Sequence, residues 1–127
     1  MIPKIIHYCW FGGQPLPEEV KKYIITWRRY CPDYEIRQWN EQNFDIIQNE
    51  YCREAYEAQK WAFVTDYVRL NVLYKYGGFY MDTDVEVCKS LENLRKYNAI
   101  SGFESKTRIQ TGVMGACLEN EWIGFLL

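Results

Sequence analysis

The chain has 127 residues and a formal net charge of −2, and this length allows at most one domain with a sizeable core. No run of Lys and Arg is longer than two residues, which argues against nucleic acid as a partner. The five cysteines are odd in number and scattered, without a Cys-x-x-Cys pair, so we expect reduced thiols instead of a disulfide framework or a zinc site.

The first part of the chain predicts a strand, a helix and a second strand. Residues 5–10 form a continuous apolar run before a loop with Gly and Pro, which is typical of a buried strand. From Pro17, apolar residues recur at helical spacing as far as Cys31, where a Pro ends the pattern. Residues 34–39 alternate and predict a strand, after which Asn40 can cap a short helical segment. This order favours a parallel α/β sheet.

The middle of the chain is expected to be helical. Residues 49–59 predict a polar helix or two turns of one. Residues 61–76 have almost no polar face, so we expect a helix buried on most sides that the two glycines at 77–78 end in a left-handed conformation. Asp66 and Arg69 stand out in it, because charges are rarely buried unless paired. We expect the two to face each other or a polar cleft.

An apolar run over residues 76–81 leads into two carboxylates, Asp82 and Asp84. On a strand, side chains two residues apart point to the same face, so both charges would enter one volume and repel each other. Mg²⁺ or Mn²⁺ would relieve the repulsion, since these ions take one or two carboxylates together with substrate phosphates. The residues alone leave two interpretations open: a metal-and-diphosphate site, or a polar turn after an edge strand.

The last third of the chain has weaker patterns. Residues 85–87 continue extended, and Ser90 can cap a short helical turn. Residues 99–103 predict a strand, and residues 109–116 predict a strand or a loop weakened by two glycines. Residues 119–127 begin a helix with an apolar face and no stop signal, so we expect a domain that is truncated at its C-terminus.

Four blocks of sequence, in a fixed order across nearly the whole chain, resemble a known family of sugar-transferring enzymes. They read IPKIIH and WFGG within residues 2–13, CPDYE and WN within residues 31–40, AFVTDYVR at residues 62–69, and GGFYMDTD at residues 77–84. This pattern resembles glycosyltransferase family 32, whose members carry a DXD motif. The grouping includes bacterial capsular-polysaccharide transferases and a yeast initiating α-1,6-mannosyltransferase, with the large clostridial glucosylating toxins as more distant relatives.

The resemblance implies a GT-A-like α/β fold with a mainly parallel sheet flanked by helices. Residues 1–127 would form a single, partial catalytic domain that contains the donor-binding part. The implied reaction moves a sugar from a nucleotide sugar, a UDP- or GDP-sugar, to a saccharide or glycolipid acceptor in polysaccharide or cell-surface glycan synthesis. It would use Mn²⁺ or Mg²⁺ and retain the anomeric configuration.

Matching positions carry the family's roles onto this chain. Trp10 would stack on the donor base, Tyr80 would flank the donor, and Asp66 and Arg69 would hold ribose and sugar hydroxyls or phosphate. Asp82 and Asp84 would bind the sugar and ribose of the donor and the metal ion. Together with Arg69, they would form the catalytic set. A cation there would neutralise the leaving diphosphate, so the site requires no protein acid. The only histidine, His7, is expected to be a hydrogen-bonded core residue.

Two other functions stay open on the sequence. A phosphatase of the haloacid dehalogenase type also places Asp-x-Asp after an apolar strand, but it needs later acidic metal ligands, and no Asp follows Asp84. A degenerate transferase could instead only bind a nucleotide sugar or serve as an interaction module. A turnover measurement would distinguish such a non-catalytic protein from an active enzyme.

Nothing in the sequence predicts a membrane-spanning or secreted protein. Residues 1–7 become polar too quickly for a signal peptide, and no apolar run is long enough to cross a bilayer. We therefore expect a cytoplasmic protein without a transmembrane segment, whose contact with a membrane would be peripheral.

Overall fold

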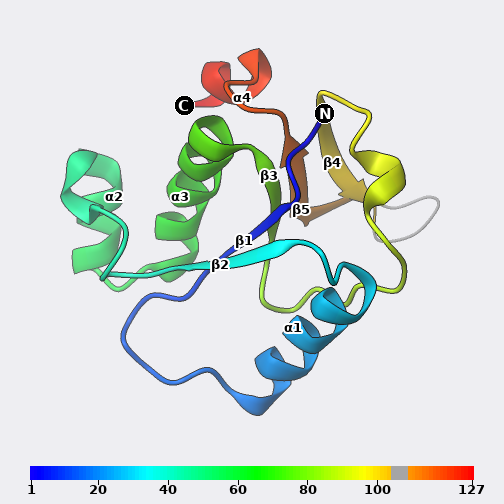
Figure 1. Ribbon diagram of the computed structural model, residues 1–127. Coiled ribbons are helices and arrows are strands. Elements are labelled where there is room, and N and C mark those ends of the chain that lie inside the picture. The colour runs from blue at the N-terminus through cyan, green and yellow to red at the C-terminus, as the bar shows by residue number, and fades with distance from the viewer. Residues whose placement is uncertain (104–108) are drawn as a thin grey trace.

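The computed structural model describes residues 1–103 and 109–127, and in this part of the chain a sheet has the strand order β2-β1-β3-β5-β4. Helices cover both faces of the sheet (Figure 1). The strands are β1 (Ile5–Cys9), β2 (Glu35–Trp39), β3 (Gly78–Met81), β4 (Ala99–Phe103) and β5 (Ile109–Ala116). The helices are α1 (Glu18–Tyr30), α2 (Glu50–Glu57), α3 (Trp61–Tyr76) and α4 (Glu121–Leu126), with short 3-10 turns η1 (Ile46–Gln48) and η2 (Glu92–Leu94).

The sheet is mixed, but most of its strands share one direction. β1 pairs in parallel with both β2 and β3. β5 pairs antiparallel with β3, and β4 pairs antiparallel with β5. Four of these strands therefore point the same way and β5 points the opposite way. The predicted α/β fold with a mainly parallel sheet flanked by helices is confirmed, and residues 109–116 form a strand.

Alternation along the central strands divides the core into two layers. Phe79 and Met81 of β3 belong to one apolar cluster, which also holds the buried face of α1. Tyr80, between them, belongs to the other cluster, with α2, α3 and α4. This is the two-residue period of a strand whose two faces are both covered. The side chains around β3 are thus fixed from both sides, and its end is a rigid place for a functional group.

Helix α1 is positioned by one apolar stripe, as the sequence predicts. Val20, Ile24 and Trp27 are buried at helical spacing. The indole nitrogen of Trp27 also donates a hydrogen bond of 2.7 Å to the carbonyl oxygen of Val85. This bond ties α1 to the chain that leaves the Asp82–Asp84 segment.

Helix α3 has the predicted bounds, but the prediction that it is buried on most sides is wrong for its first half. Val68, Val72 and Leu73 are fully or almost fully buried, whereas Phe63 is 48% exposed and Asp66 is also exposed. On the core side of these turns Val64 is fully buried, whereas Ala62, Thr65 and Asp66 line the pocket described below. The apolar composition alone therefore does not show which side of the helix is buried.

The junction of α3 and β3 is held close to β1. Gly77 and Gly78 both have positive φ, at 67° and 106°, and a Cβ on Gly78 would lie 2.7 Å from the carbonyl oxygen of Ile5. The buried His7 ring contacts the Gly77 carbonyl oxygen at 2.8 Å through Nε2 and accepts a 3.0 Å hydrogen bond from the Trp39 indole at Nδ1. His7 is therefore a core residue, as expected, and it fixes the start of β3.

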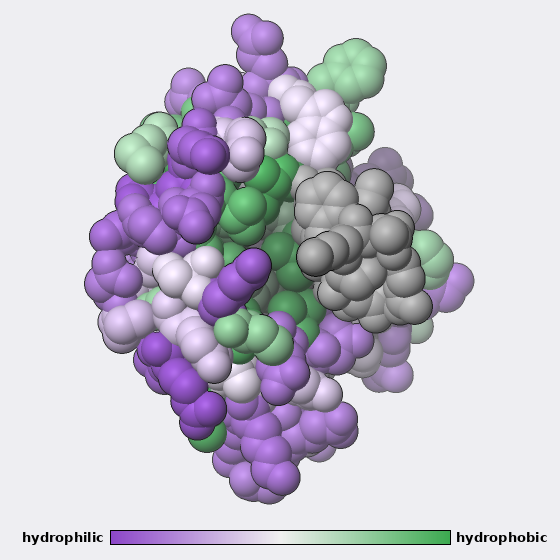
Figure 2. Space-filling model, turned by 90° about the vertical axis from the view of Figure 1, so that its right-hand side faces the viewer, coloured by the Kyte–Doolittle hydropathy of each residue, from purple (hydrophilic) through white to green (hydrophobic). Residues whose placement is uncertain are grey.

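The surface seen in Figure 2 is hydrophilic around most of its margin, with apolar side chains gathered near its middle. Within residues 1–103 and 109–127, no helix combines the length and the apolar character needed to cross a membrane.

Candidate active site

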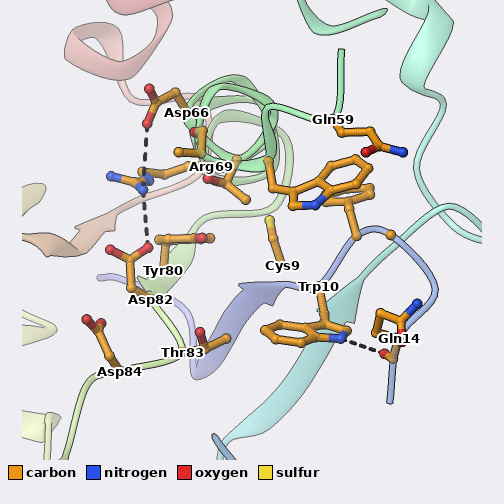
Figure 3. A pocket seen from close by; sticks show the side chains of 15 residues that line it. Cys9, Trp10, Gln14, Gln59, Asp66, Arg69, Tyr80, Asp82, Thr83 and Asp84 are labelled. Atoms are coloured by element: carbon orange, nitrogen blue, oxygen red, sulfur yellow. Dashed lines mark hydrogen bonds and ion pairs between the residues drawn. The ribbon is translucent and has the colours of Figure 1, made fainter. Parts of the chain in front are cut away.

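A pocket of about 810 Å³ lies at the carboxyl ends of β1 and β3. Three segments distant in sequence form it: the end of β1 with its loop, the first half of α3, and the end of β3 with the turn that follows (Figure 3). Every residue that the sequence assigned to the site lines this pocket. These residues are Trp10, Asp66, Arg69, Tyr80, Asp82 and Asp84.

The two motif carboxylates lie in a turn and not on a strand. β3 ends at Met81, and the backbone nitrogen of Val85 donates a 3.2 Å hydrogen bond to the carbonyl oxygen of Asp82. The prediction that strand alternation directs both side chains to one face is therefore wrong, because the chain turns back so that Val85 can enter the core. Asp82 and Asp84 nevertheless line the same pocket. β3 is a central strand, so the edge-strand alternative does not describe this segment either.

Arg69 connects α3 to this turn. Its Nη2 lies 3.2 Å from Oδ1 of Asp82 and 3.9 Å from Oδ1 of Asp66 (Figure 3). The guanidinium carbon also lies 4.7 Å from the centre of the Tyr80 ring, over its face. The Arg69 side chain is only 13% exposed. The sequence predicted that Asp66 and Arg69 face either each other or a polar cleft, and in the structure they do both.

Burial and charge shift the pKa values of the groups on the pocket floor. Burial raises the pKa of Asp82, the Arg69 cation opposes this shift, and the Asp84 carboxylate adds to it. Burial also raises the pKa of the Tyr80 hydroxyl well above its usual value and that of the Cys9 thiol to about 12. Tyr80 and Cys9 therefore stay protonated at neutral pH.

Two tryptophans line the pocket. The Trp10 indole nitrogen donates a 2.7 Å hydrogen bond to the carbonyl oxygen of Gln14, within the loop after β1 (Figure 3). Trp61, at the start of α3, packs against that loop: a Cβ on Gly12 would lie 3.2 Å from its Cζ2. The pocket thus has an aromatic wall, formed by Trp10 and Trp61, in addition to an acidic floor, formed by Asp82 and Asp84.

The sequence patterns predicted only part of this pocket. Trp61 could have been found, since it is four residues before Thr65 and eight before Arg69, which is the spacing of one helix face. The loop residues carry no such signal, because their place depends on how the loop packs on α3. The lining residues that were not assigned are Cys9, Phe11, Gly12, Gln14, Gln59, Trp61, Ala62, Thr65 and Thr83.

An α/β fold with an Asp-x-Asp pair in a pocket at the end of a central strand, beside a paired arginine, is the arrangement expected from the resemblance to glycosyltransferases with a DXD motif. Comparison with known families agrees: residues 17–101 match the family described as "Glycosyltransferase sugar-binding region containing DXD motif". The chain belongs to this family. This membership overturns the interpretation of a phosphatase of the haloacid dehalogenase type.

Two of the similar proteins are named as a mannosyltransferase and as a synthase of a mannosyl lipid. The chain is 34% identical over 121 residues to "Inositol phosphoceramide mannosyltransferase 3" of Schizosaccharomyces pombe, covering 90% of this chain and 33% of that protein. It is 30% identical over 120 residues to "Mannosyl phosphorylinositol ceramide synthase SUR1" of Saccharomyces cerevisiae, covering 91% of this chain and 31% of that protein. The chain thus spans about a third of the length of these curated relatives.

A solved structure supports the fold. The chain superposes on "PaToxG Glycosyltransferase" with a TM-score of 0.74 and 22% sequence identity, over 97% of this chain and 57% of that chain. This likeness shows a shared fold.

Proposed function

We propose that this domain binds a nucleotide sugar in the pocket and transfers its sugar to a saccharide or glycolipid acceptor, with a divalent cation and with retention of configuration. The observation that carries the proposal is the Arg69 bridge between Asp66 and Asp82, in the same pocket as Asp84 and Trp10. A cation and carboxylates at one end and an indole at the other suit the charged diphosphate and the planar base of one ligand.

The carboxylates suit Mn²⁺ or Mg²⁺ bound together with the donor. Among the residues that the structure describes, no group of three or more His, Cys, Asp or Glu could hold a metal by itself. Two carboxylates with mutual repulsion fit an ion that takes its remaining ligands from diphosphate and water. Such an ion, when bound, would neutralise charge that develops on the leaving diphosphate.

The chain's own residues would divide the remaining work. Arg69 is always charged and presents a planar fork, so it would bind diphosphate oxygens and stabilise the leaving group. Asp66, exposed at the rim, would accept hydrogen bonds from ribose or sugar hydroxyls. Trp10 would stack on the base, and Tyr80, buried under the guanidinium, would hold Arg69 in place from below.

The names of the relatives narrow the first substrates to test. They specify mannosyl transfer to inositol phosphoceramide, so we infer a mannosyl nucleotide as donor and a lipid with an inositol phosphate headgroup as acceptor. UDP-sugars and saccharide acceptors form the second set.

Calorimetry with Mn²⁺ and GDP or UDP tests the proposal at Asp84. We expect Mn²⁺ to bind weakly alone and more tightly with a nucleoside diphosphate, and we expect Asp84→Asn to remove this coupling because one of two carboxylate ligands is lost. Glu86→Gln, which removes a nearby exposed carboxylate outside the pocket, is the matched control. If Asp84→Asn keeps the parental metal-dependent affinity, Asp84 is not a ligand. Binding without hydrolysis or transfer of any sugar would indicate a non-catalytic module.

A further inference from the structure

Glu41 reaches the pocket loop from a turn that lies outside the pocket. The turn follows β2 and is fixed by its own hydrogen bonds, from the Gln42 nitrogen to Asn40 Oδ1 at 2.9 Å and from the Phe44 nitrogen to the Asn40 carbonyl oxygen at 3.0 Å. From this turn, Oε2 of Glu41 accepts a 2.5 Å hydrogen bond from the Gly12 backbone nitrogen. Glu41 thus links the turn after β2 to the loop after β1 by a hydrogen bond.

The same oxygen also holds helix α2. The Tyr56 hydroxyl donates a 3.1 Å hydrogen bond to Oε2 of Glu41. The Tyr56 ring in turn packs edge-on against Trp61, with ring centres 5.4 Å apart and an interplanar angle of 62°. One carboxylate oxygen therefore connects Gly12, two residues after Trp10, with the ring that supports Trp61.

The loop needs such an anchor because glycine leaves it conformationally free. Gly12 and Gly13 have φ of 103° and 76°, and residues of this kind lose more backbone freedom on ordering than others. Burial alone would raise the pKa of Glu41, but hydrogen bonds from the Gly12 backbone, from its own backbone and from the Tyr56 hydroxyl hold that pKa below its usual value. Glu41 is consequently ionised at neutral pH, and its hydrogen bonds are of the stronger, charge-assisted kind.

We propose that Glu41 is a positioning residue, which locks the Trp10 loop to α2 and to the start of α3 so that Trp10 and Trp61 together form the base-binding wall of the pocket. Glu41 is not among the pocket-lining residues, so it acts through the two indoles and not on the ligand. The identity of the ligand, a nucleoside diphosphate, rests on the proposed function. The locking of the loop does not.

The test uses variants of the 127-residue chain and three measurements. Glu41→Ala removes both hydrogen bonds, Glu41→Gln keeps an oxygen that can accept from Gly12, and Glu57→Ala is the control, because Glu57 is an exposed carboxylate on α2 paired only with Arg53 among the contacts shown. Amide hydrogen exchange at Gly12 reports the loop in the absence of ligand. Calorimetry with UDP, GDP and inorganic pyrophosphate, each with Mn²⁺, separates the base from the diphosphate, and thermal unfolding reports stability.

We expect Gly12 to exchange faster in Glu41→Ala and the affinity for UDP or GDP to fall about tenfold, which corresponds to about 1.4 kcal/mol. The affinity for pyrophosphate should not change, because the acidic floor is untouched. Glu41→Gln should lie between Glu41→Ala and the parent, and Glu57→Ala should match the parent. Trp10→Ala, which removes the indole itself, should weaken nucleotide binding at least as much as Glu41→Ala.

Three results would overturn the positioning role. They are unchanged Gly12 exchange in Glu41→Ala, equal losses of pyrophosphate and nucleotide affinity, or a lower melting temperature with parental nucleotide affinity at a temperature where the variant is folded. A parent that binds neither UDP nor GDP would instead refute the proposed function and the ligand named here. Gly12 exchange would then still decide whether Glu41 locks the loop.

Discussion

At the scale of single residues, the site is organised around Arg69. Its guanidinium lies between the carboxylates of Asp66 and Asp82 and over the ring of Tyr80, so one cation joins α3 to the turn after β3. The contacts differ in strength: the 3.2 Å contact to the half-buried Asp82 is a direct ion pair, and the 3.9 Å contact to the exposed Asp66 is at the limit of one. Asp66 is thus the partner that a ligand can engage at little cost to the fold.

We predict that Asp66→Asn and Arg69→Lys each reduce donor-sugar hydrolysis or transfer at least tenfold, about 1.4 kcal/mol of transition-state stabilisation. Asn keeps the shape of Asp66 but loses its charge, and Lys cannot reproduce the planar fork that contacts Asp82 and stacks on Tyr80. Melting temperatures should stay near the parental value, and Arg53→Lys, in an exposed pair on α2, is the control. Lost stability with unchanged activity per folded molecule would reduce the pair to an internal salt bridge.

The sequence could predict these charged residues because their chemistry is local. An apolar helix with a charge pair, and an apolar run before Asp82 and Asp84, are visible without any tertiary information. Glu41 could not be predicted in this way, since it is one of many polar residues and its role depends on a contact with Gly12, 29 positions away. A residue that acts through another residue leaves no pattern in its own neighbourhood.

At the scale of elements, the sequence patterns predicted the positions of α1, α3, β1 and β2 closely. They failed where an element meets the pocket. The first turns of α3 are apolar, yet Phe63 is exposed while Val64 is buried, and the end of β3 is a turn although its alternation continues. In both places some side chains line the pocket while Val64 and Val85 are buried in the core, so apolar periodicity alone does not predict burial there.

The contact of β1 with the α3–β3 junction predicts a pH dependence of stability. Burial lowers the pKa of His7 from 6.5 to about 4 in the folded protein, although its hydrogen bond to Gly77 opposes this shift. Between these values the unfolded chain binds a proton that the folded chain excludes, so stability is lost as the pH falls from about 6.5 towards 4. The full loss would be about 3 kcal/mol.

Urea unfolding at pH 7 and pH 5 measures this effect in a range where most carboxylates stay ionised. We expect the parent to lose stability over the range and His7→Gln, whose amide can still donate to the Gly77 carbonyl oxygen, to be less stable at pH 7 but nearly independent of pH. An equal loss in parent and variant would assign the pH dependence to other groups.

At the scale of the whole molecule, the pocket is formed by segments that range from Cys9 to Asp84 in the sequence. Only the folded sheet brings these segments together. A ligand that contacts all three segments binds only the folded state, and it therefore stabilises the fold in proportion to its affinity. The melting temperature of the chain therefore reports which ligands the pocket binds, and this measurement does not require that the acceptor is known.

We predict that GDP- or UDP-sugars with Mn²⁺ raise the melting temperature by several degrees, since a ligand at a hundred times its Kd adds about 2.7 kcal/mol to stability. The sugar nucleotide without metal should give a smaller shift, because Asp82 and Asp84 then repel each other and the diphosphate together. Mn²⁺ alone should have little effect, and Asp84→Asn should remove the part of the shift that requires metal. Inorganic phosphate and free mannose control for non-specific stabilisation. Identical shifts with and without Mn²⁺ in both parent and Asp84→Asn would show that the carboxylates do not act through a cation, and the proposed donor geometry would then be wrong.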